Sequence, residues 1–188
     1  MWVSLLILMK CWMFCEGIWG RLNIYIEIAL AALMCYNQMG GGVKMIRVYL
    51  DNCCFNRPYD NQSHLKIELE TKAKLKIQEM IVDGKLELVT SYILEQENDD
   101  NPYLERRTTI EDFLKYATID LDETHEIINI AEVAKEVGLK TKDSLHVACA
   151  IVGSCDYMLT TDKRLLKYED ERIQVLNPMQ FLIEMEGI

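Results

Sequence analysis

The sequence is poor in the residues that build a zinc site or a disulfide framework. Its seven cysteines include no C-x-x-C pair, and only three histidines accompany them. Structural zinc sites commonly use such pairs, and small secreted folds use an even, regularly spaced set of cysteines. An odd number of cysteines without that spacing favours reduced thiols, which are typical of a cytoplasmic protein.

Positive charge is also scarce. Lysine and arginine number 20 against 30 aspartates and glutamates, so the formal net charge is −10 and the pI is near 4.8. A protein that binds nucleic acid through a broad basic surface shows the opposite sign. The charge therefore argues against a plain nucleic-acid-binding module. It does not argue against a nuclease whose carboxylates hold metal ions, or against a protein with a basic partner.

The chain has no uninterrupted apolar run long enough to cross a membrane. The longest uncharged stretch near the amino terminus, Ile28 to Val43, is shorter than a membrane span and ends in glycines. A secretory signal is conceivable around Leu5 to Met9, but no basic segment precedes this apolar part. We therefore predict a protein without membrane contact.

Residues 1–44 have a different interpretation. They are rich in Met, Trp, Cys and Leu, without a clear helical or strand period, and three glycines stand just before Met45. Because glycine codons are G-rich, this is how a translated ribosome-binding site would look. We predict that residues 1–44 are a non-native or disordered extension from a mis-assigned start, and that residues 45–188 form one domain.

Short apolar runs alternate with helical patterns after Met45, and no internal repeat or low-complexity linker interrupts them. Strands are predicted at 47–50, 86–91, 119–121, 157–160 and 173–175. Helices are predicted at 65–82, with Ser63 as N-cap, and at 92–98, 103–116, 123–137, 142–152, 162–168 and 178–185. This alternation predicts an α/β fold, in which a central parallel sheet is covered by helices on both faces.

Four carboxylates lie near predicted strand ends or helix starts: Asp51, Glu95, Asp143 and Asp162. In a parallel α/β fold these points converge on one edge of the sheet. The acids would repel one another there, and a divalent cation with oxygen ligands, Mg²⁺ or Mn²⁺, would relieve the repulsion. The alternatives are helix capping by Asp143 and Asp162 and a solvated position for Glu95.

The segments around these acids form a recognisable set. They are Tyr49-Leu50-Asp51-Asn52, Leu94-Glu95, Lys142-Asp143-Ser144-Leu145-His146-Val147-Ala148 and Leu159-Thr160-Thr161-Asp162. Together they resemble the PIN-domain nucleases, including the VapC-type toxins of bacterial toxin–antitoxin pairs. The D-x-x-H-x-A helix followed by an L-T-x-D strand end is the specific part. The resemblance runs from Met45 to about Leu182.

The resemblance implies a single PIN-like domain with the activity of a Mg²⁺- or Mn²⁺-dependent endoribonuclease that cleaves single-stranded RNA. Asp51, Glu95 and Asp143 would be the core metal ligands, and Asp162 would complete the catalytic site. It also implies that the protein is the cytoplasmic toxin of a toxin–antitoxin pair. An antitoxin protein would then cover the acidic groove, and dimers are compatible with this assembly.

The candidate substrate contacts are basic or polar residues near the acids. Arg57, Lys163 and Arg164 are closest in sequence to them and are favoured for phosphate contact, ahead of Arg106 and Arg107. Asn52 and Thr161 add polar contacts. His146 is interpreted as a packed, hydrogen-bonded histidine rather than a catalytic base, and Cys53 and Cys54 as packing residues.

Two other functions stay open from the sequence. One is a non-catalytic or regulatory PIN-fold protein that binds RNA or a partner, although the complete acidic set argues against it. The other is a phosphotransferase of the haloacid-dehalogenase type, which also begins with a strand ending in aspartate. That chemistry requires a second aspartate two residues further on, where this chain has Cys53.

Overall fold

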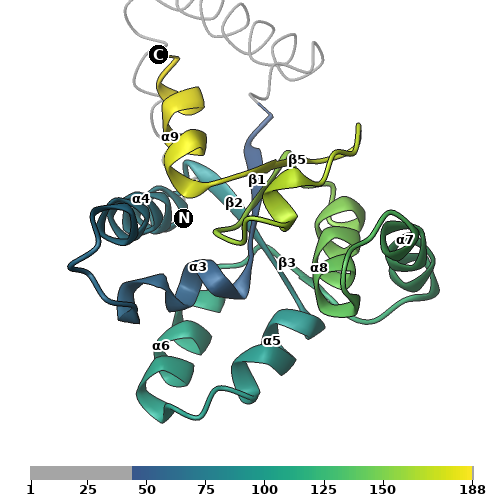
Figure 1. Ribbon diagram of the computed structural model, residues 1–188, viewed down its shortest axis with the longest axis horizontal. Helices are drawn as coiled ribbons and strands as arrows, with labels where there is room; N and C mark the ends of the chain where they lie inside the picture. Colours follow the sequence, from purple (N-terminus) through teal and green to yellow (C-terminus); the bar gives the residue numbers. More distant parts are fainter. Residues whose placement is uncertain (1–43, 188) are drawn as a thin grey trace, which may run out of the picture. The chain divides into compact units, whose positions relative to one another are not determined.

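The computed structural model describes residues 44–187, so the predictions for the amino-terminal extension fall almost entirely outside the described residues. Five parallel strands form one sheet in the order β3-β2-β1-β4-β5 (Figure 1). Their bounds are β1 Ile46–Leu50, β2 Leu86–Ser91, β3 Ile119–Leu121, β4 Tyr157–Leu159 and β5 Gln174–Leu176. The predicted parallel sheet is confirmed.

Helices cover both faces of this sheet, as predicted. In Figure 1, α4 and α9 lie on one side and α7 and α8 on the other, while α3, α5 and α6 lie below the sheet. The helices are α3 Asn52–Asn56, α4 Leu65–Val82, α5 Tyr92–Asp99, α6 Leu104–Leu114, α7 His125–Glu136, α8 Thr141–Val152 and α9 Pro178–Glu186. Two short 3-10 helices, η1 Arg57–Tyr59 and η2 Leu165–Lys167, complete the described elements.

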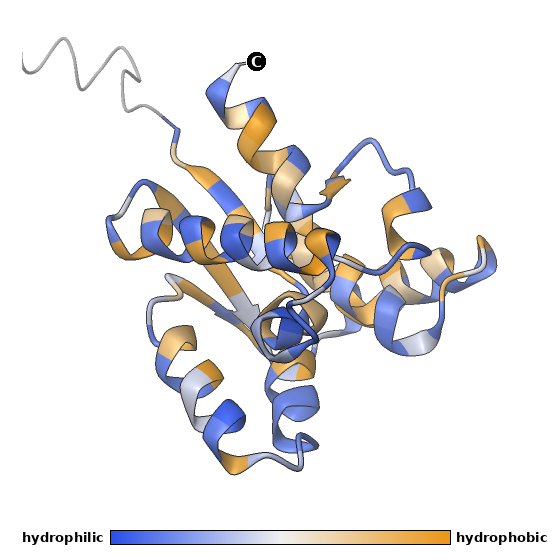
Figure 2. Ribbon diagram, turned by 60° about the vertical axis from the view of Figure 1, so that its left-hand side comes forward, coloured by the Kyte–Doolittle hydropathy of each residue, from blue (hydrophilic) through white to orange (hydrophobic). Residues whose placement is uncertain are grey.

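Alternate residues of the central strands enter two separate cores, because successive side chains of a strand point to opposite faces. Val48 and Leu50 of β1 pack with residues of α3, α4, α6 and α9, whereas Tyr49 packs with residues of α7 and α8. All three side chains are almost completely buried. The surrounding helices carry both hydrophobic (orange) and hydrophilic (blue) residues in Figure 2. The apolar run of β1 is thus explained by burial on both faces.

The direction in which successive strands are added to the sheet reverses at the neighbouring strands β1 and β4. From β1 it proceeds to β2 and β3 on one side, and then returns through α7 and α8 to β4 on the other side. The ends of β1 and β4 are joined by a hydrogen bond from the Asp51 amide to the Leu159 carbonyl (2.9 Å). Open α/β sheets bind ligands at such a switch point, beyond the carboxyl ends of the strands.

Two predicted segments differ in detail. No helix was predicted between residues 51 and 64, but the chain forms α3 and η1 there, because Cys54 and Phe55 are buried against the sheet. The helix predicted at 162–168 shrinks to η2. There the Arg164 amide donates to the Asp162 side chain (2.6 Å), a local hydrogen bond that competes with helix formation.

Smaller differences concern helix ends, membrane helices and thiols. His64, not Ser63, precedes α4, and its side chain makes no capping hydrogen bond. None of the helices between residues 44 and 187 has the length and apolarity needed to cross a membrane. Cys53, Cys54, Cys149 and Cys155 are free thiols.

Helix α4 carries a buried carboxylate that connects three elements. Glu70 is fully buried and accepts a hydrogen bond from the Asn177 side chain, just before α9 (2.7 Å). Its other oxygen lies 3.0 Å from Nε of Arg57, an ion-pair distance without hydrogen-bond geometry. Lys66 also approaches the carboxylate (3.4 Å). A buried charge needs such partners, and these fix η1 and the start of α9 against α4.

Lys74, also on α4, is a buried cation whose substitution measures the free-energy cost of burying a charge in this helix. Its side chain is 5% exposed and lies over the Phe55 ring, 5.5 Å from the centroid. Burial lowers the pKa of Lys74 to about 8. No carboxylate of the described chain lies within ion-pair distance of it.

We expect the substitution Lys74→Met to raise the free energy of unfolding at pH 7 by up to about 3 kcal/mol, because the cost of burying the charge disappears. Below pH 8 that cost is fully present. Above it the unfolded chain binds a proton that the folded chain has lost, so the stability of the wild type should rise with pH up to the ordinary lysine value. Chemical denaturation at several pH values measures both effects.

Lys72→Met is the matched control, since Lys72 is an exposed residue of the same helix, paired with Glu68. It should change stability little and without this pH dependence. A Lys74→Met protein less stable than the wild type at pH 7 would show that the ring contact and packing outweigh the burial cost.

Candidate active site

Asp51 is the residue around which the site is arranged. It directly follows β1 and is 8% exposed. Its Oδ2 atom accepts hydrogen bonds from Oγ1 of Thr160 (2.7 Å) and from Sγ of Cys53 (3.0 Å). No described residue donates to Oδ1. One oxygen therefore fixes the carboxylate while the other is left for a ligand.

Glu97 and His146 lie beside Asp51. One ligand atom from each of the three residues lies within 4.8 Å of the others, so the group could hold a metal ion. Nε2 of His146 is 3.1 Å from a Glu97 oxygen, and Nδ1 is 2.7 Å from the Tyr49 hydroxyl. The hydroxyl of Tyr49 also contacts Oγ of Ser91 (2.7 Å). A hydrogen-bonded chain thus leads from the core to the site.

Two protons of this chain can be assigned, one on Nε2 of His146 and one on the hydroxyl of Tyr49. Partial burial raises the pKa of Glu97, but the hydrogen bond and charge of His146, together with Lys142 and Asn52, bring it below its ordinary value. Glu97 is therefore an acceptor, and Nε2 of His146 carries the proton. Burial raises the pKa of Tyr49 well above its ordinary value, so its hydroxyl stays protonated, and this hydroxyl is hydrogen-bonded to Nδ1. Since both nitrogens of His146 have partners, the arrangement favours carboxylate ligands, with His146 orienting Glu97.

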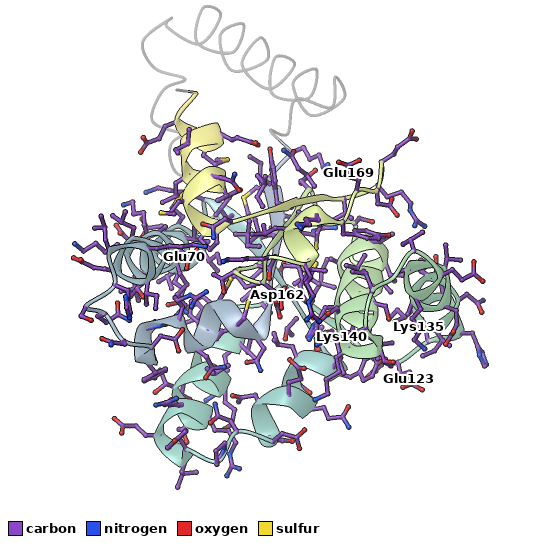
Figure 3. The ribbon with its side chains drawn as sticks, viewed as in Figure 1. Glu70, Glu123, Lys135, Lys140, Asp162 and Glu169 are labelled. Carbon is purple, nitrogen blue, oxygen red and sulfur yellow. The ribbon has the colours of Figure 1, made fainter. Side chains whose placement is uncertain are left out.

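Asp143 lies close enough to Asp51 and Asp162 to interact with both electrostatically. Asp143 lies in the first turn of α8, and Asp162 follows β4 in the region between α3 and α8 (Figure 3). Burial, and then the charges of Asp162 and Asp51, raise the pKa of Asp143. Asp143 therefore interacts with both other carboxylates, although the chain brings the three residues from different elements.

Glu95 is not brought into this group. Its side chain is exposed, and its pKa is raised by partial burial and then by the charges of Asp120, Asp99 and Asp122. Glu97 occupies the place expected for Glu95. The reason is helix geometry, because two residues turn α5 by about 200° and put the two side chains on opposite faces.

A signal for Glu97 was present in the sequence. Ile93 and Leu94 are buried residues of α5, and residues four positions further on share their face of the helix. Asn98 follows Leu94 in this way and is buried, and Glu97 follows Ile93 and is partly buried. The inward-facing acid could therefore have been chosen by its spacing from Ile93.

Four of the five predicted substrate contacts line one pocket next to Asp162. The pocket has a volume of about 540 Å³ and is lined by Cys53, Asn56, Arg57, Asp60, Thr161, Asp162, Lys163 and Arg164. Arg57 is held by Asp60 (2.8 Å) and Glu70. Lys163 and Arg164, in contrast, have no carboxylate of the described chain within ion-pair distance. Asn52 lies outside this lining and contacts Glu97.

Comparison with known proteins identifies the family. The model of the PIN domain matches residues 48–171, more than half of the chain, and the chain therefore belongs to the PIN domain family. PIN domains are generally nucleases. No curated protein sequence matches the chain.

Two solved structures are similar in part. FitAcB from Neisseria gonorrhoeae has 15% sequence identity and a TM-score of 0.47, covering 70% of this chain and 98% of its own. VapBC2 from Rickettsia felis, bound to a DNA fragment from their promoter, has 12% identity and a TM-score of 0.46, with the same coverage of 70% and 98%.

We expect Glu97→Gln to weaken Mn²⁺ binding to the full chain strongly, and Glu95→Gln to leave it nearly unchanged. Both substitutions remove one carboxylate charge from α5, and they differ only in the face of the helix from which the charge is removed. Removing a metal ligand should lower the Mn²⁺ affinity by more than the roughly 10- to 100-fold that is typical when a residue that only orients a ligand is removed. Calorimetric titration with Mn²⁺ alone measures the affinities. An equal loss in the two variants would place the binding site elsewhere.

Proposed function

We propose that this protein is a divalent-metal-dependent endoribonuclease that cleaves single-stranded RNA and acts as the toxin of a toxin–antitoxin pair. The observation that carries the proposal is the approach of Asp51, Glu97 and His146 within 4.8 Å, at the switch point of a PIN-family sheet. Asp143 and Asp162 add two further carboxylates to the same region.

The donor set fits Mg²⁺ or Mn²⁺. Asp51 offers Oδ1 without a competing donor, and Glu97 is ionised because His146 and Lys142 lower its pKa. We propose Asp51, Glu97 and Asp143 as the residues that hold the ion, and Asp162 as the residue that completes the catalytic site, directly or through water. A bound ion of this kind lowers the pKa of a water and stabilises negative charge on a phosphodiester.

The protein's own residues orient these groups. Thr160 and Cys53 fix one oxygen of Asp51, and His146 fixes Glu97 while Tyr49 fixes His146. His146 has both nitrogens engaged, so it acts as a positioning residue rather than as the general base. Such prior orientation matters because the carboxylates need no reorganisation when an ion and a substrate bind.

Phosphate contact is proposed for Lys163 and Arg164, with Thr161 and Asn52 as polar contacts. Lys163 and Arg164 border the 540 Å³ pocket beside Asp162. Arg57 borders the same pocket, but its guanidinium already pairs with Asp60 and Glu70, so we assign it mainly to holding η1 in place.

An antitoxin protein is the proposed partner. The acidic site and the net charge of −10 suit a basic or amphipathic segment that covers the groove. Such a segment would compete with RNA for the carboxylates and the neighbouring pocket. The homodimer and the cytoplasmic location that the resemblance implies stay predictions.

Cleavage of a mixed single-stranded RNA by the full chain tests the enzymatic part of this proposal. With Mg²⁺ or Mn²⁺ the wild type should cut, and a chelator should stop it. The cleavage rate should fall about 100-fold or more in each of the variants Asp51→Asn, Glu97→Gln and Asp143→Asn. Removing a metal ligand has a larger effect than removing a residue that only orients one. Glu95→Gln is the control and should retain most of the activity.

Two results would contradict the enzymatic proposal. One is cleavage that persists in the Asp51→Asn protein, which would indicate a contaminating nuclease. The other is Mn²⁺ binding by a wild type that cuts no RNA, which would favour the non-catalytic alternative. The antitoxin part is tested by purifying the native protein and identifying a small co-purifying basic protein that inhibits cleavage.

A further inference from the structure

An arginine and two tyrosines form a stack on the surface near η1 and α6. The guanidinium carbon of Arg106 lies 4.0 Å from the centroid of the Tyr103 ring and 4.6 Å from that of Tyr59. The tyrosines are 57% and 38% exposed. These three residues, called the Tyr–Arg–Tyr stack below, present aromatic rings and a charge to solvent.

The stack has an unusual charge environment for so acidic a chain. Most lysines and arginines between residues 47 and 187 have a carboxylate within ion-pair distance, from Arg47 with Glu87 to Arg172 with Asp170. Arg106 has none. The other solvent-accessible exceptions in this range lie near Asp143 or after Asp162: Lys140, Lys163, Arg164 and Lys167. Apart from Arg106, the exposed cations without a carboxylate partner in this range therefore lie within about five residues of Asp143 or Asp162 in the sequence.

A run of three asparagines connects the stack to the candidate active site. The side chain of Asn52 interacts with Glu97 and helps to lower its pKa, and the side chain of Asn56 donates to that of Asn52 (3.1 Å). The side chain of Asn101 donates to that of Asn56 (3.2 Å), and its oxygen accepts from the Tyr103 amide (3.1 Å). Hydrogen bonds thus connect Tyr103 to Asn52, whose side chain interacts with the carboxylate of Glu97.

We propose that the Tyr–Arg–Tyr stack is a base-stacking subsite, which holds an unpaired base of the RNA beside the cleavage site. The inference rests on the proposed function and extends it to the residues that select the substrate. Aromatic rings and arginine planes stack on bases of any sequence, and they do so only where the base is not already stacked and paired in a duplex. The subsite would therefore favour single strands.

The charge of the stack argues for RNA rather than for the antitoxin. A basic antitoxin segment would be repelled by Arg106, whose charge no described carboxylate pairs with. A phosphate next to the stacked base would be attracted by it, and so would phosphates along Lys163 and Arg164. The exposed rings add stacking energy that a purely electrostatic surface lacks.

The test is the affinity for a labelled single-stranded RNA of about 12 nucleotides, a typical site size, measured by fluorescence anisotropy. All proteins carry Asp51→Asn so that the probe is not cut. The double variant Tyr59→Leu, Tyr103→Leu should bind about 5- to 150-fold more weakly, the range for one lost base stack. The matched control, Tyr59→Phe, Tyr103→Phe, keeps both rings and should bind like its parent. Thermal unfolding checks that the substitutions at these exposed positions do not alter the fold.

A second probe without bases separates stacking from phosphate contact. The parent should bind this abasic strand more weakly than RNA, because no base can stack on the tyrosines. The leucine variant should bind the abasic strand with the same affinity as the parent, because the stacking interaction that the substitutions remove is already missing from this probe. Equal losses on both probes would overturn the proposal, since the tyrosines would then act on the backbone.

Other outcomes distinguish this inference from the proposed function. If the wild type cleaves RNA while the leucine variant binds it with unchanged affinity, only the stacking subsite is wrong. If the wild type neither cuts nor binds single-stranded RNA, both proposals fail. If the leucine variant loses a co-purifying protein while its RNA affinity is unchanged, the surface serves a protein partner and the stacking proposal is overturned.

Discussion

Asp51 and Glu97 are held close together although their negative charges repel each other. The protein offsets this repulsion with directed hydrogen bonds rather than with a nearby lysine or arginine alone. Thr160 and Cys53 donate to Asp51, and His146 donates to Glu97 from a chain that begins at Ser91 in the core. Because that chain includes Tyr49 of the central strand, the geometry of the site depends on the packing of the sheet.

The same constraint explains how charge is distributed in this acidic protein. Asp51 and Asp162 directly follow β1 and β4, and Lys163 and Arg164, which have no carboxylate partner in the described chain, border the pocket beside Asp162. A polyanionic substrate would meet local positive charge at Lys163, Arg164 and Arg106 in spite of the net charge of −10. The acidity of the chain is therefore compatible with RNA as substrate.

Much of the fold could be predicted from the sequence, since burial on both faces makes the strands apolar and local signals end the helices. β2 was predicted with its observed bounds, and Asp83 and Gly84 end α4 as expected. Segments 52–59 were harder, because the order of α3 and η1 comes from the burial of Cys54 and Phe55 against the sheet. Such tertiary contacts leave no periodic pattern in eight residues.

The candidate site was predictable in part for a similar reason. Asp51, Asp143 and Asp162 follow from their places next to strands and helix starts. The choice between Glu95 and Glu97 depends on which face of α5 meets the sheet, and the resemblance to a short motif pointed to the outward-facing acid. The chain through Tyr49 and Ser91 joins residues 42 positions apart, and only the folded sheet brings them together.

The position of a bound Mn²⁺ ion tests the central claim most directly. Anomalous diffraction from crystals of the full chain grown with Mn²⁺ locates the ion independently of any assay. The account predicts an anomalous peak between Asp51 and Glu97, within coordination distance of a carboxylate oxygen from each. A peak beside Glu95, among Asp99, Asp120 and Asp122, with none at Asp51 would contradict it.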